Sequence, residues 1–418
     1  MASKAQLHLM TSLVNIPQFK VIDYQFQSGI GIFLKIEKKE PKVQCPSCSK
    51  TTDKLHQNHW YVVRDLPFGD KQVYLQVNRR QIRCDGCGSK FSEELEFVKK
   101  KRTYTERFKN KIIEEVLESD IKNVARRNGV SEQEVETMLK ELAAGFIEEK
   151  PQELKKLGID EIAVVKGQKN YYVVLIDLEK RALVGMVEKR TTADSAAGAR
   201  TRATIEQYLS SWGREVLSQI EEVSIDLWKP YKKVIEELMP QAEIVADRFH
   251  VMKQVNEELD TKRKEIKKQV EKLKNKAERE KGLLALKKSK YALLKNEETL
   301  KESEKEKLES IRNVIPELAR LHRLKEEFRN VFEKSKDWVE GLFNLSDWLR
   351  EAQNYFADSC GTIKRWIGEI IAYFDQRTTQ GVVEDINNKL KLIKRRGYGF
   401  RNFNNFKLRS FLTWHFAS

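Results

Sequence analysis

The cysteines constrain the N-terminal part of this 418-residue chain more than any other feature. Four of the five cysteines form two CxxC pairs, Cys45 with Cys48 and Cys84 with Cys87, and only Cys360 is left over. Each pair supplies two thiolates from one tight turn. Four thiolates suit a tetrahedral, structural Zn²⁺ site with no ligand position left open. Unliganded thiols or a redox CxxC are the alternatives, but two pairs beside Gly or Pro favour zinc.

The interval between the two pairs predicts a zinc ribbon. Its 35 residues exceed the usual finger spacing, but residues 61–84 alternate apolar and polar side chains and carry a turn at Phe68-Gly69-Asp70. Such alternation is typical of a half-buried β-hairpin, which accommodates the long interval between two knuckles. We therefore expect residues 1–98 to be a compact, β-rich zinc-ribbon domain.

The charge of the chain favours a polyanionic partner. Lys and Arg number 78 against 63 Asp and Glu, a formal net charge of +15, and residues 386–418 contain no acidic residue. A merely soluble basic protein is the alternative, but this concentration of charge argues against it. We see no signal peptide and no apolar run long enough to span a bilayer. Cysteines arranged for metal rather than disulfides fit a reducing cytoplasm.

Residues 99–148 are expected to form a DNA-binding helix-turn-helix. Gly129 and Val130 form the turn, and Ser131 with Glu134 forms a capping box that starts the last helix. That helix would enter the major groove. An ordinary helical hairpin fits the pattern equally well, but the neighbouring zinc ribbon and basic linker favour DNA binding. The candidate DNA contacts here are Lys99, Lys100, Lys101, Arg102, Arg126 and Arg127.

Residues 149–254 change to strands that then alternate with helices. Strand-like runs at 159–165, 170–179 and 181–189 have tight connections, through Gly167-Gln168-Lys169 and Glu179-Lys180, and predict an antiparallel meander. A helix, a strand, a second helix and a fifth strand follow. This order is that of a ribonuclease-H-like fold, so we expect a multidomain α/β protein with this fold as its catalytic core.

Three carboxylates are the candidate catalytic residues. Asp160 lies on the first strand and Asp226 at the end of the fourth, and the sheet should make these strands neighbours. Glu384 lies far along the chain, on a predicted helix. Three such groups can hold two Mg²⁺ or Mn²⁺ ions for phosphodiester chemistry. Each Asp alone could be a strand-end cap. Glu161 should face the opposite side of the sheet, and Asp177, near a hairpin turn, should be structural.

Asp247 and His250 begin a helix after the fifth strand. They could support the metals from outside the set of direct ligands, or contact the scissile phosphate. The alternative is an ordinary helix start, with Asp247 as the cap. We expect the pair to support the site without either residue being a primary metal ligand.

Two further segments complete the chain. Residues 255–375 are charged and helical, and are expected to be an α-helical insertion whose lysines contact phosphates or form a solvated face. Residues 376–418 return to the catalytic core with Glu384 and a basic tail. The candidate DNA contacts of the tail are Lys391, Lys394, Arg395, Arg396 and Arg401. Aromatic residues in the tail could stack on unpaired bases, but we expect core packing for most of Tyr398, Phe400, Phe403 and Phe406.

These motifs together resemble the DDE-type insertion-sequence transposases, and closely the ISL-three family. The resemblance covers nearly the whole chain, and rests on the CxxC pairs and the runs GIDEIAVVKG, VSIDLWKPYKKVI, PQAEIVADRFHVMKQVN and VVEDINNKLKLIKRRGYGFRNFNNFKLR. It implies a ribonuclease-H-like domain interrupted by an all-α insertion before the final Glu. It maps the catalytic triad onto Asp160, Asp226 and Glu384, and likens Asp247-x-x-His250 to the Cys/Asp-x-x-His signature of related transposases.

The resemblance also implies an activity. A transposase of this kind binds the terminal inverted repeats of its insertion sequence, cuts DNA by metal-dependent phosphoryl transfer and joins the ends to target DNA. Because two ends must be cut together, a homodimer or larger assembly on double-stranded DNA is expected, in the nucleoid of a bacterium or archaeon. The rival hypotheses are a non-catalytic DNA-binding regulator and a ribonuclease-H-like nuclease that only cuts.

Overall fold

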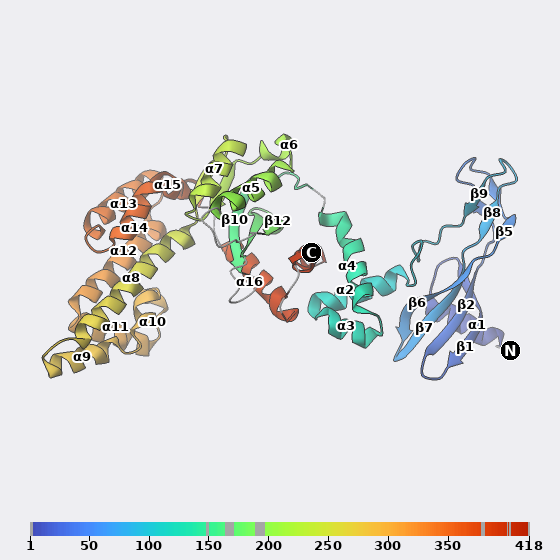
Figure 1. The fold of residues 1–418 in the computed structure, drawn as a ribbon, viewed down its shortest axis with the longest axis horizontal. Coiled ribbons are helices and arrows are strands. Elements are labelled where there is room, and N and C mark those ends of the chain that lie inside the picture. The colour runs from blue at the N-terminus through green and yellow to red at the C-terminus, as the bar shows by residue number, and fades with distance from the viewer. Residues whose placement is uncertain are drawn as a thin grey trace. The chain divides into compact units, whose positions relative to one another are not determined.

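The computed structural model describes residues 3–147, 150–163, 171–188, 197–377, 381–398, 400 and 403–416. The chain divides into two compact units, Met1–Ala144 and Gly145–Ser418 (Figure 1). Each unit has its own hydrophobic core, so each is treated separately.

A four-stranded sheet forms the base of the first unit. Its strands run in the order β1-β2-β7-β6, and β2 and β7 are parallel. The predicted hairpin is β6 and β7, and Gly69 supplies the left-handed backbone of its turn, with φ 61°. The helix α1 packs against β1 and was not predicted. The bounds are α1 Lys4–Val14, β1 Phe19–Gln27, β2 Gly31–Lys38, β6 Trp60–Phe68 and β7 Lys71–Asn78.

Short strands carry the two cysteine turns. The pair β3 and β4 encloses the first turn, and β8 and β9 enclose the second, while β5 pairs with β8. The bounds are β3 Val43–Gln44, β4 Thr51–Thr52, β5 Leu55–Gln57, β8 Gln81–Arg83 and β9 Lys90–Ser92.

Three helices complete the first unit: α2 Glu106–Glu118, α3 Ile121–Asn128 and α4 Glu132–Ile147. The turn between α3 and α4 is the predicted one, because Gly129 adopts φ 59° and ends α3. The predicted capping box is also present. The amide of Glu134 donates to the Ser131 hydroxyl (3.1 Å), and the amide of Ser131 donates to the Glu134 carboxylate (2.9 Å).

A buried carboxylate ties these helices to the sheet. Asp65 of β6 is fully buried, accepts a hydrogen bond from the Thr105 hydroxyl at the start of α2 (2.8 Å) and pairs with Arg107. We expect Asp65→Ala to destabilise the first unit by about 2 kcal/mol, because it leaves the buried Thr105 hydroxyl and the half-buried Arg107 without their acceptor. Urea unfolding would measure this loss. Asp70→Ala, at the exposed turn, is the control and should be neutral within about 0.5 kcal/mol.

A five-stranded sheet lies at the centre of the second unit, in the order β12-β11-β10-β13-β14. The antiparallel meander of the first three strands is as predicted, and β10 is the neighbour of β13, to which it runs parallel. The turn expected at 167–169 lies outside the described residues. The bounds are β10 Lys156–Ala163, β11 Tyr171–Asp177, β12 Ala182–Glu188, β13 Glu222–Ile225 and β14 Glu243–Ala246.

Helices cover both faces of this sheet. On one face, Leu157 and Ile159 of β10 share a hydrophobic core with α5 (Ala197–Ser210), α6 (Arg214–Leu217) and α7 (Lys229–Leu238). On the other face, Ile162 of β10 packs with residues of α16 (Gly381–Arg396) and α17 (Phe403–Phe416). Alternation along β10 therefore directs Asp160 towards α16 and Glu161 towards α7.

The segment between β14 and α16 is helical. Figure 1 shows α8 leading from the sheet into this region. Although α8 and α9 are joined by residues without Gly or Pro, the helix breaks there, and the Asn275 side chain caps α9. No described helix is long and apolar enough to cross a bilayer. The helices are α8 Arg248–Glu271, α9 Lys276–Leu286, α10 Ser289–Leu294, the 3₁₀ turn Glu297–Thr299, α11 Glu302–Val314, α12 Pro316–Lys334, α13 Trp338–Ala352, α14 Ala357–Arg365 and α15 Ile367–Gln376.

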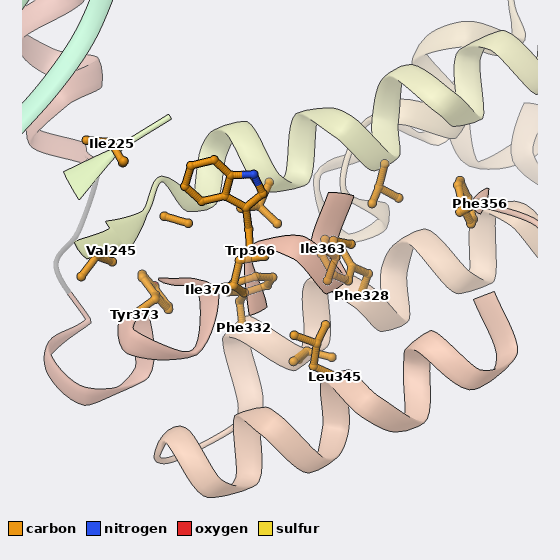
Figure 2. Packing of buried hydrophobic residues seen from close by; sticks show 14 of the residues in the cluster. Ile225, Val245, Phe328, Phe332, Leu345, Phe356, Ile363, Trp366, Ile370 and Tyr373 are labelled. Carbon is orange, nitrogen blue, oxygen red and sulfur yellow. The ribbon is translucent and has the colours of Figure 1, made fainter. Parts of the chain in front are cut away.

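The helical region and the sheet share one core. Figure 2 shows part of this core. Ile225 of β13 and Val245 of β14 belong to the same cluster of buried side chains as Phe332, Trp366 and Tyr373 of the helical region. Aromatic pairs strengthen this packing, since the rings of Phe332 and Tyr373 meet edge to face at 5.6 Å. The helical region is therefore held firmly against the edge of the sheet.

Candidate functional site

The four cysteine sulfurs gather at one point of the first unit. Their Sγ atoms all lie within 4.8 Å of one another, with Cys45 and Cys87 at 3.7 Å and Cys48 and Cys84 at 3.5 Å. Four sulfurs bonded to zinc at about 2.3 Å would stand roughly 3.8 Å apart at the corners of a tetrahedron. The cluster therefore has the dimensions of a Zn²⁺ site, as predicted. Cys360 is buried in the core of the second unit and takes no part.

The two cysteine turns have the same backbone geometry. The amide of Ser49 donates to the Cys45 carbonyl, and that of Gly88 to the Cys84 carbonyl, each at 2.9 Å. Both residues adopt positive φ, 59° at Ser49 and 73° at Gly88. The Ser89 hydroxyl lies 3.4 Å from the sulfur of Cys45 and 3.0 Å from that of Cys87. This hydrogen bonding lowers the pKa of Cys45 to about 6 and lowers that of Cys87, which favours thiolates.

The predicted DNA contacts of the first unit lie on its surface. Lys99, Lys100 and Lys101 are exposed, as are Arg126 and Arg127 on α3. Arg102 is half-buried and pairs with Glu141 of α4. Exposed ion pairs contribute little stability, so the cations at positions 99–101, 126 and 127 can exchange protein partners for phosphates at small cost.

The two predicted catalytic aspartates belong to neighbouring parallel strands, because Asp160 lies on β10 and Asp226 directly follows β13. The recorded register pairs Gly158 of β10 with Ser224 of β13. Two residues further along both strands are Asp160 and Asp226, so the same register puts these residues at one level. Neighbouring strands lie about 4.8 Å apart. The strand pairing confirms that these two strands are neighbours, as predicted, while the shared metal site stays a prediction.

A third aspartate extends this row. Strand β14 pairs with β13 in the register Ile225 with Ala246, and Asp226 and Asp247 are the residues that directly follow these two strands. The Asp247 amide donates to the Ile225 carbonyl at 2.7 Å, which fixes this alignment. Asp160, Asp226 and Asp247 therefore occupy one level across three adjacent parallel strands.

Helix α16 presents its polar side to this row. The Asn387 side-chain amide donates a hydrogen bond to the Asp160 carboxylate. Glu384 stands three residues before Asn387, which puts both side chains on one face of the helix. Val383 packs near Gly158 of β10, and Ile386 and Leu390 are buried in the core. The apolar side of α16 thus packs on the sheet, and the exposed Glu384 side chain lines the same cavity as Asp160.

A cavity of about 410 Å³ joins most of these groups. Its lining residues are Asp160, Glu161, Ile162, Asp247, Phe249, His250, Lys253, Gly381, Val383, Glu384, Asn387 and Lys391. Asp226 is half-buried beside this cavity without lining it. Among the described residues, only the four cysteines bring three or more potential ligand atoms within 4.8 Å of one another. The carboxylates of Asp160, Asp226 and Glu384 would therefore have to move closer together to share one ion. A bound cation would favour this movement, because its positive charge offsets the repulsion between the carboxylates.

Asp247 and His250 form a hydrogen-bonded pair at the start of α8. The Asp247 carboxylate caps the helix, accepting from the Phe249 amide at 2.6 Å, and also lies 3.0 Å from Nδ1 of His250. The helix-cap interpretation is thus confirmed, and both residues also line the cavity, while their supporting role at the site stays a prediction. Burial lowers the pKa of His250, but Asp247, with Asp160 and Asp226, outweighs burial and raises it. Burial also raises the pKa of Asp160.

Tyr231 is a site residue that sequence reasoning missed. Its buried hydroxyl donates to the Glu161 carboxylate at 2.7 Å, from the face of the sheet opposite to Asp160. Burial, and then the charges of Glu161, Asp226 and Asp160, raise the pKa of Tyr231 well above its ordinary value. Tyr231 is thus a neutral hydrogen-bond donor next to the aspartates. Its position five residues after Asp226, in the first turn of the following helix, was the available signal.

The basic tail divides between surface and core. Lys391 is exposed and lines the cavity, Arg395 is exposed, and Lys394 and Arg396 are half-buried. Arg401 lies outside the described residues. By contrast, Arg409 is buried, with its guanidinium 5.1 Å from the centre of the Phe400 ring. Not all of the acid-free segment is therefore available to DNA.

The aromatic residues of the tail mostly pack inside, as expected. Phe403 stacks on Tyr172 at 4.5 Å, and Phe406 is fully buried. Phe400 lies 5.1 Å from Phe406. Tyr398 is the exception, because 85% of its surface is exposed. Asp177 is structural, as predicted: it is buried and accepts hydrogen bonds from the amides of the turn at 179 and 180.

Comparison with known protein families assigns all three parts of the chain. Residues 157–410 match a family described as transposase, which covers more than half of the chain. Residues 41–87 match the zinc-finger of transposase IS204/IS1001/IS1096/IS1165, and residues 93–143 match the helix-turn-helix domain of transposase family ISL3. With the four-cysteine cluster, the second match identifies a structural zinc site.

Individual relatives agree with these families. The chain is 27% identical over 380 residues to the transposase for insertion sequence element IS1001 of Bordetella parapertussis, across 89% of this chain and 88% of the relative. It is 32% identical over 268 residues to the transposase for insertion sequence element IS1557 of Mycobacterium tuberculosis, across 60% of this chain and 57% of the relative. The chain therefore belongs to transposase family ISL3, the ISL-three family that its sequence motifs resemble.

Proposed function

We propose that this chain is a DDE transposase that binds the terminal inverted repeats of an insertion sequence and catalyses metal-dependent strand cleavage and strand transfer into target DNA. The observation that carries the proposal is the row formed by Asp160, Asp226 and Asp247 across three parallel strands. Glu384 faces this row from α16, and the cavity contains its side chain together with Asp160. A binding module would have no use for acidic groups that repel DNA at this point.

The residues present fit divalent metal. Asp160, Asp226 and Glu384 offer hard carboxylate oxygens, the ligands that Mg²⁺ and Mn²⁺ prefer. Two such ions would activate the attacking water or 3′-OH and stabilise the leaving 3′ oxygen. Cysteine and additional histidine ligands, which would favour softer metals, are missing from the described lining of the cavity.

The other groups in the cavity have supporting roles. The His250 imidazole, with its raised pKa, can hold a proton and offer positive charge to a non-bridging phosphate oxygen. Asp247 orients that ring through Nδ1. Lys391, exposed at the edge of the cavity, supplies a second cation for the DNA backbone. Tyr231 holds Glu161 away from the row of aspartates.

The architecture supports the same proposal. The strand order and the helices on both faces of the sheet are those expected of a ribonuclease-H-like catalytic core, interrupted at 255–375 by an all-α insertion. The zinc ribbon and helix-turn-helix would recognise the terminal repeats, and Lys99, Arg126 and Arg127 would contact their phosphates. We propose a homodimer or larger assembly, because two transposon ends must be processed together.

The test is cleavage of defined DNA. The DNA that flanks the gene should contain imperfect inverted repeats, and a duplex carrying one repeat is the substrate. We expect strand cleavage in Mg²⁺ or Mn²⁺ and strand transfer from a pre-cut end with a free 3′-OH. Binding without cleavage would favour a regulator, whereas cleavage without transfer would favour a nuclease.

Asn387 gives a finer test of the site. Its side chain links α16 to Asp160, so we expect Asn387→Ala to lower the cleavage rate about 10–100-fold while leaving DNA affinity unchanged. Rate measurements at increasing Mn²⁺ should recover part of the loss, because the metal can reorder the loosened carboxylate. Asn388→Ala is the matched control, since that neighbouring residue is exposed and points elsewhere on the helix. Equal losses for both variants would contradict the positioning role.

A further inference from the structure

A second, smaller pocket lies between α7 and the junction of α14 with α15. Its volume is about 190 Å³, and its lining residues are Lys229, Lys232, Lys233, Glu236, Arg365 and Trp366. Four of these six side chains are cationic. They come from two parts of the chain that are more than 130 residues apart, and the shared core of the second unit brings them together.

The positive charge of this pocket is largely unneutralised. Within the described part of the chain, no carboxylate lies within 4 Å of the charged groups of Lys229, Lys233 and Arg365, all of which are exposed. Lys232 does pair with Glu369, and lies 3.9 Å from Glu236. On α8, by contrast, cations such as Lys253 and Lys267 pair with acids one turn along the helix. A cluster of like charges around a hollow is a feature of anion-binding surfaces.

The wall of the pocket is rigid. Trp366 is only 3% exposed and is packed in the core that β13 and β14 share with the helical region (Figure 2). The Nζ atom of Lys232 lies 5.7 Å from the centre of the Trp366 ring. The indole N–H of Trp366 makes no hydrogen bond to any described residue, so this donor is left for water or a ligand. The contact with this fixed ring restrains the Lys232 ammonium, so the cation has a defined position in the pocket wall.

The position of the pocket connects it to the catalytic aspartates. Lys229 begins α7 three residues after Asp226. Three residues span at most about 11 Å, so a phosphate in the pocket would lie within a few nucleotides of a scissile phosphate at Asp226. Three lysines of the pocket belong to α7, which covers one face of the sheet, whereas Glu384 and Lys391 belong to α16, which covers the other face.

From these observations we propose that the pocket is a DNA-backbone site: it binds a phosphate of the strand that passes Asp226, on the side of the scissile phosphate away from α16. This rests on the proposed function, because it names the path of the DNA through the same catalytic site. The helical region then contributes directly to substrate binding through Arg365 and Trp366. The contact is to phosphate and carries no sequence preference.

The experiment compares two duplexes in the absence of divalent cations, so that no cleavage occurs. One carries the terminal repeat and extends past the cleavage position, and the other stops before it. For the full-length chain with both Lys233→Gln and Arg365→Gln, we expect weaker binding of the long duplex. The slope of log K against log salt should fall by roughly 1–2, at about 0.9 per lost phosphate contact. Binding of the short duplex should be unchanged.

The matched control replaces two exposed lysines at the far end of the helical region, Lys274→Gln with Lys281→Gln, and should leave both duplexes unaffected. Zinc content and thermal melting check that every variant is folded. Unchanged salt slopes for the pocket variant on the long duplex would overturn the proposal, as would an equal loss on both duplexes. Neither outcome depends on cleavage, so an inactive wild-type protein would refute the proposed function and leave this binding test valid.

Discussion

Asp160→Asn, Asp226→Asn and Glu384→Gln should each abolish DNA cleavage and strand transfer. Each change keeps the size of the side chain and removes a negative charge that divalent cations need. The loss should exceed the 10–100-fold range that is typical when a group outside the direct ligand set is removed. Gel assays on a terminal-repeat duplex in Mg²⁺ and in Mn²⁺ would measure it. DNA affinity should survive, because binding is assigned to the zinc ribbon, the helix-turn-helix and exposed cations.

Three controls separate the triad from its neighbours. Asp385→Asn should remain active, because adjacent residues of α16 point about 100° apart and only one can face the row of aspartates. Asp177→Asn should also remain active, since its carboxylate only holds a turn. Asp247→Asn should retain measurable activity as a supporting group. An inactive Asp385→Asn beside an active Glu384→Gln would show that the wrong acid of α16 has been assigned.

Cys84→Ser should remove the zinc and, with it, recognition of the transposon ends. Purified wild-type protein should contain about one zinc per chain, bound by four thiolates. Metal binding supplies roughly 10–16 kcal/mol in isolated zinc-finger peptides, so the short strands around the cysteine turns cannot persist without it. The β1-β2-β7-β6 sheet has its own hydrophobic core and should remain folded. Elemental analysis, limited proteolysis and a binding assay would follow these three effects.

Cys360→Ser is the control for this variant. Cys360 is 2% exposed in the core of the second unit, and burial raises its pKa to about 11, which marks it as a packing residue. The Cys360→Ser protein should keep its zinc and its affinity for DNA, even if its free energy of unfolding falls. If Cys84→Ser kept its zinc, the four-cysteine assignment would fail. If it lost zinc but bound the ends normally, recognition would have to lie in the helix-turn-helix alone.

The tertiary structure changes how the basic composition should be understood. The acid-free tail favoured a polyanionic partner, yet two of its cations lie inside the fold: Arg409 is buried over an aromatic ring, and Lys407 is half-buried with its pKa lowered by burial. Conversely, Lys229 and Lys233 were not among the predicted DNA contacts, but they converge with Arg365 on one pocket. A cationic side chain can bind DNA only if it is exposed and is not already paired with a carboxylate. Amino-acid composition gives neither of these properties.

The sequence by itself determined the local features of this protein. Spacing predicted the cysteine cluster, the Phe68-Gly69-Asp70 turn and the capping box of Ser131 with Glu134, because each depends on residues a few positions apart. Alternation along β10 also determined that Asp160 and Glu161 face opposite ways. Glu384 was a candidate because it begins the basic segment, and the family resemblance assigned it the third position of the triad.

Only the tertiary structure decided which distant groups meet. The register of β10, β13 and β14 aligns Asp160 with Asp226 and Asp247. The packing of α16 brings Asn387 to Asp160, and the fold of α7 brings Tyr231 to Glu161. These contacts depend on strand pairing and on the burial of apolar helix faces. The residues that they join are up to 227 positions apart in the chain. Contacts between distant residues are determined by the free energy of packing the whole core. They therefore cannot be predicted from the sequence of any short segment.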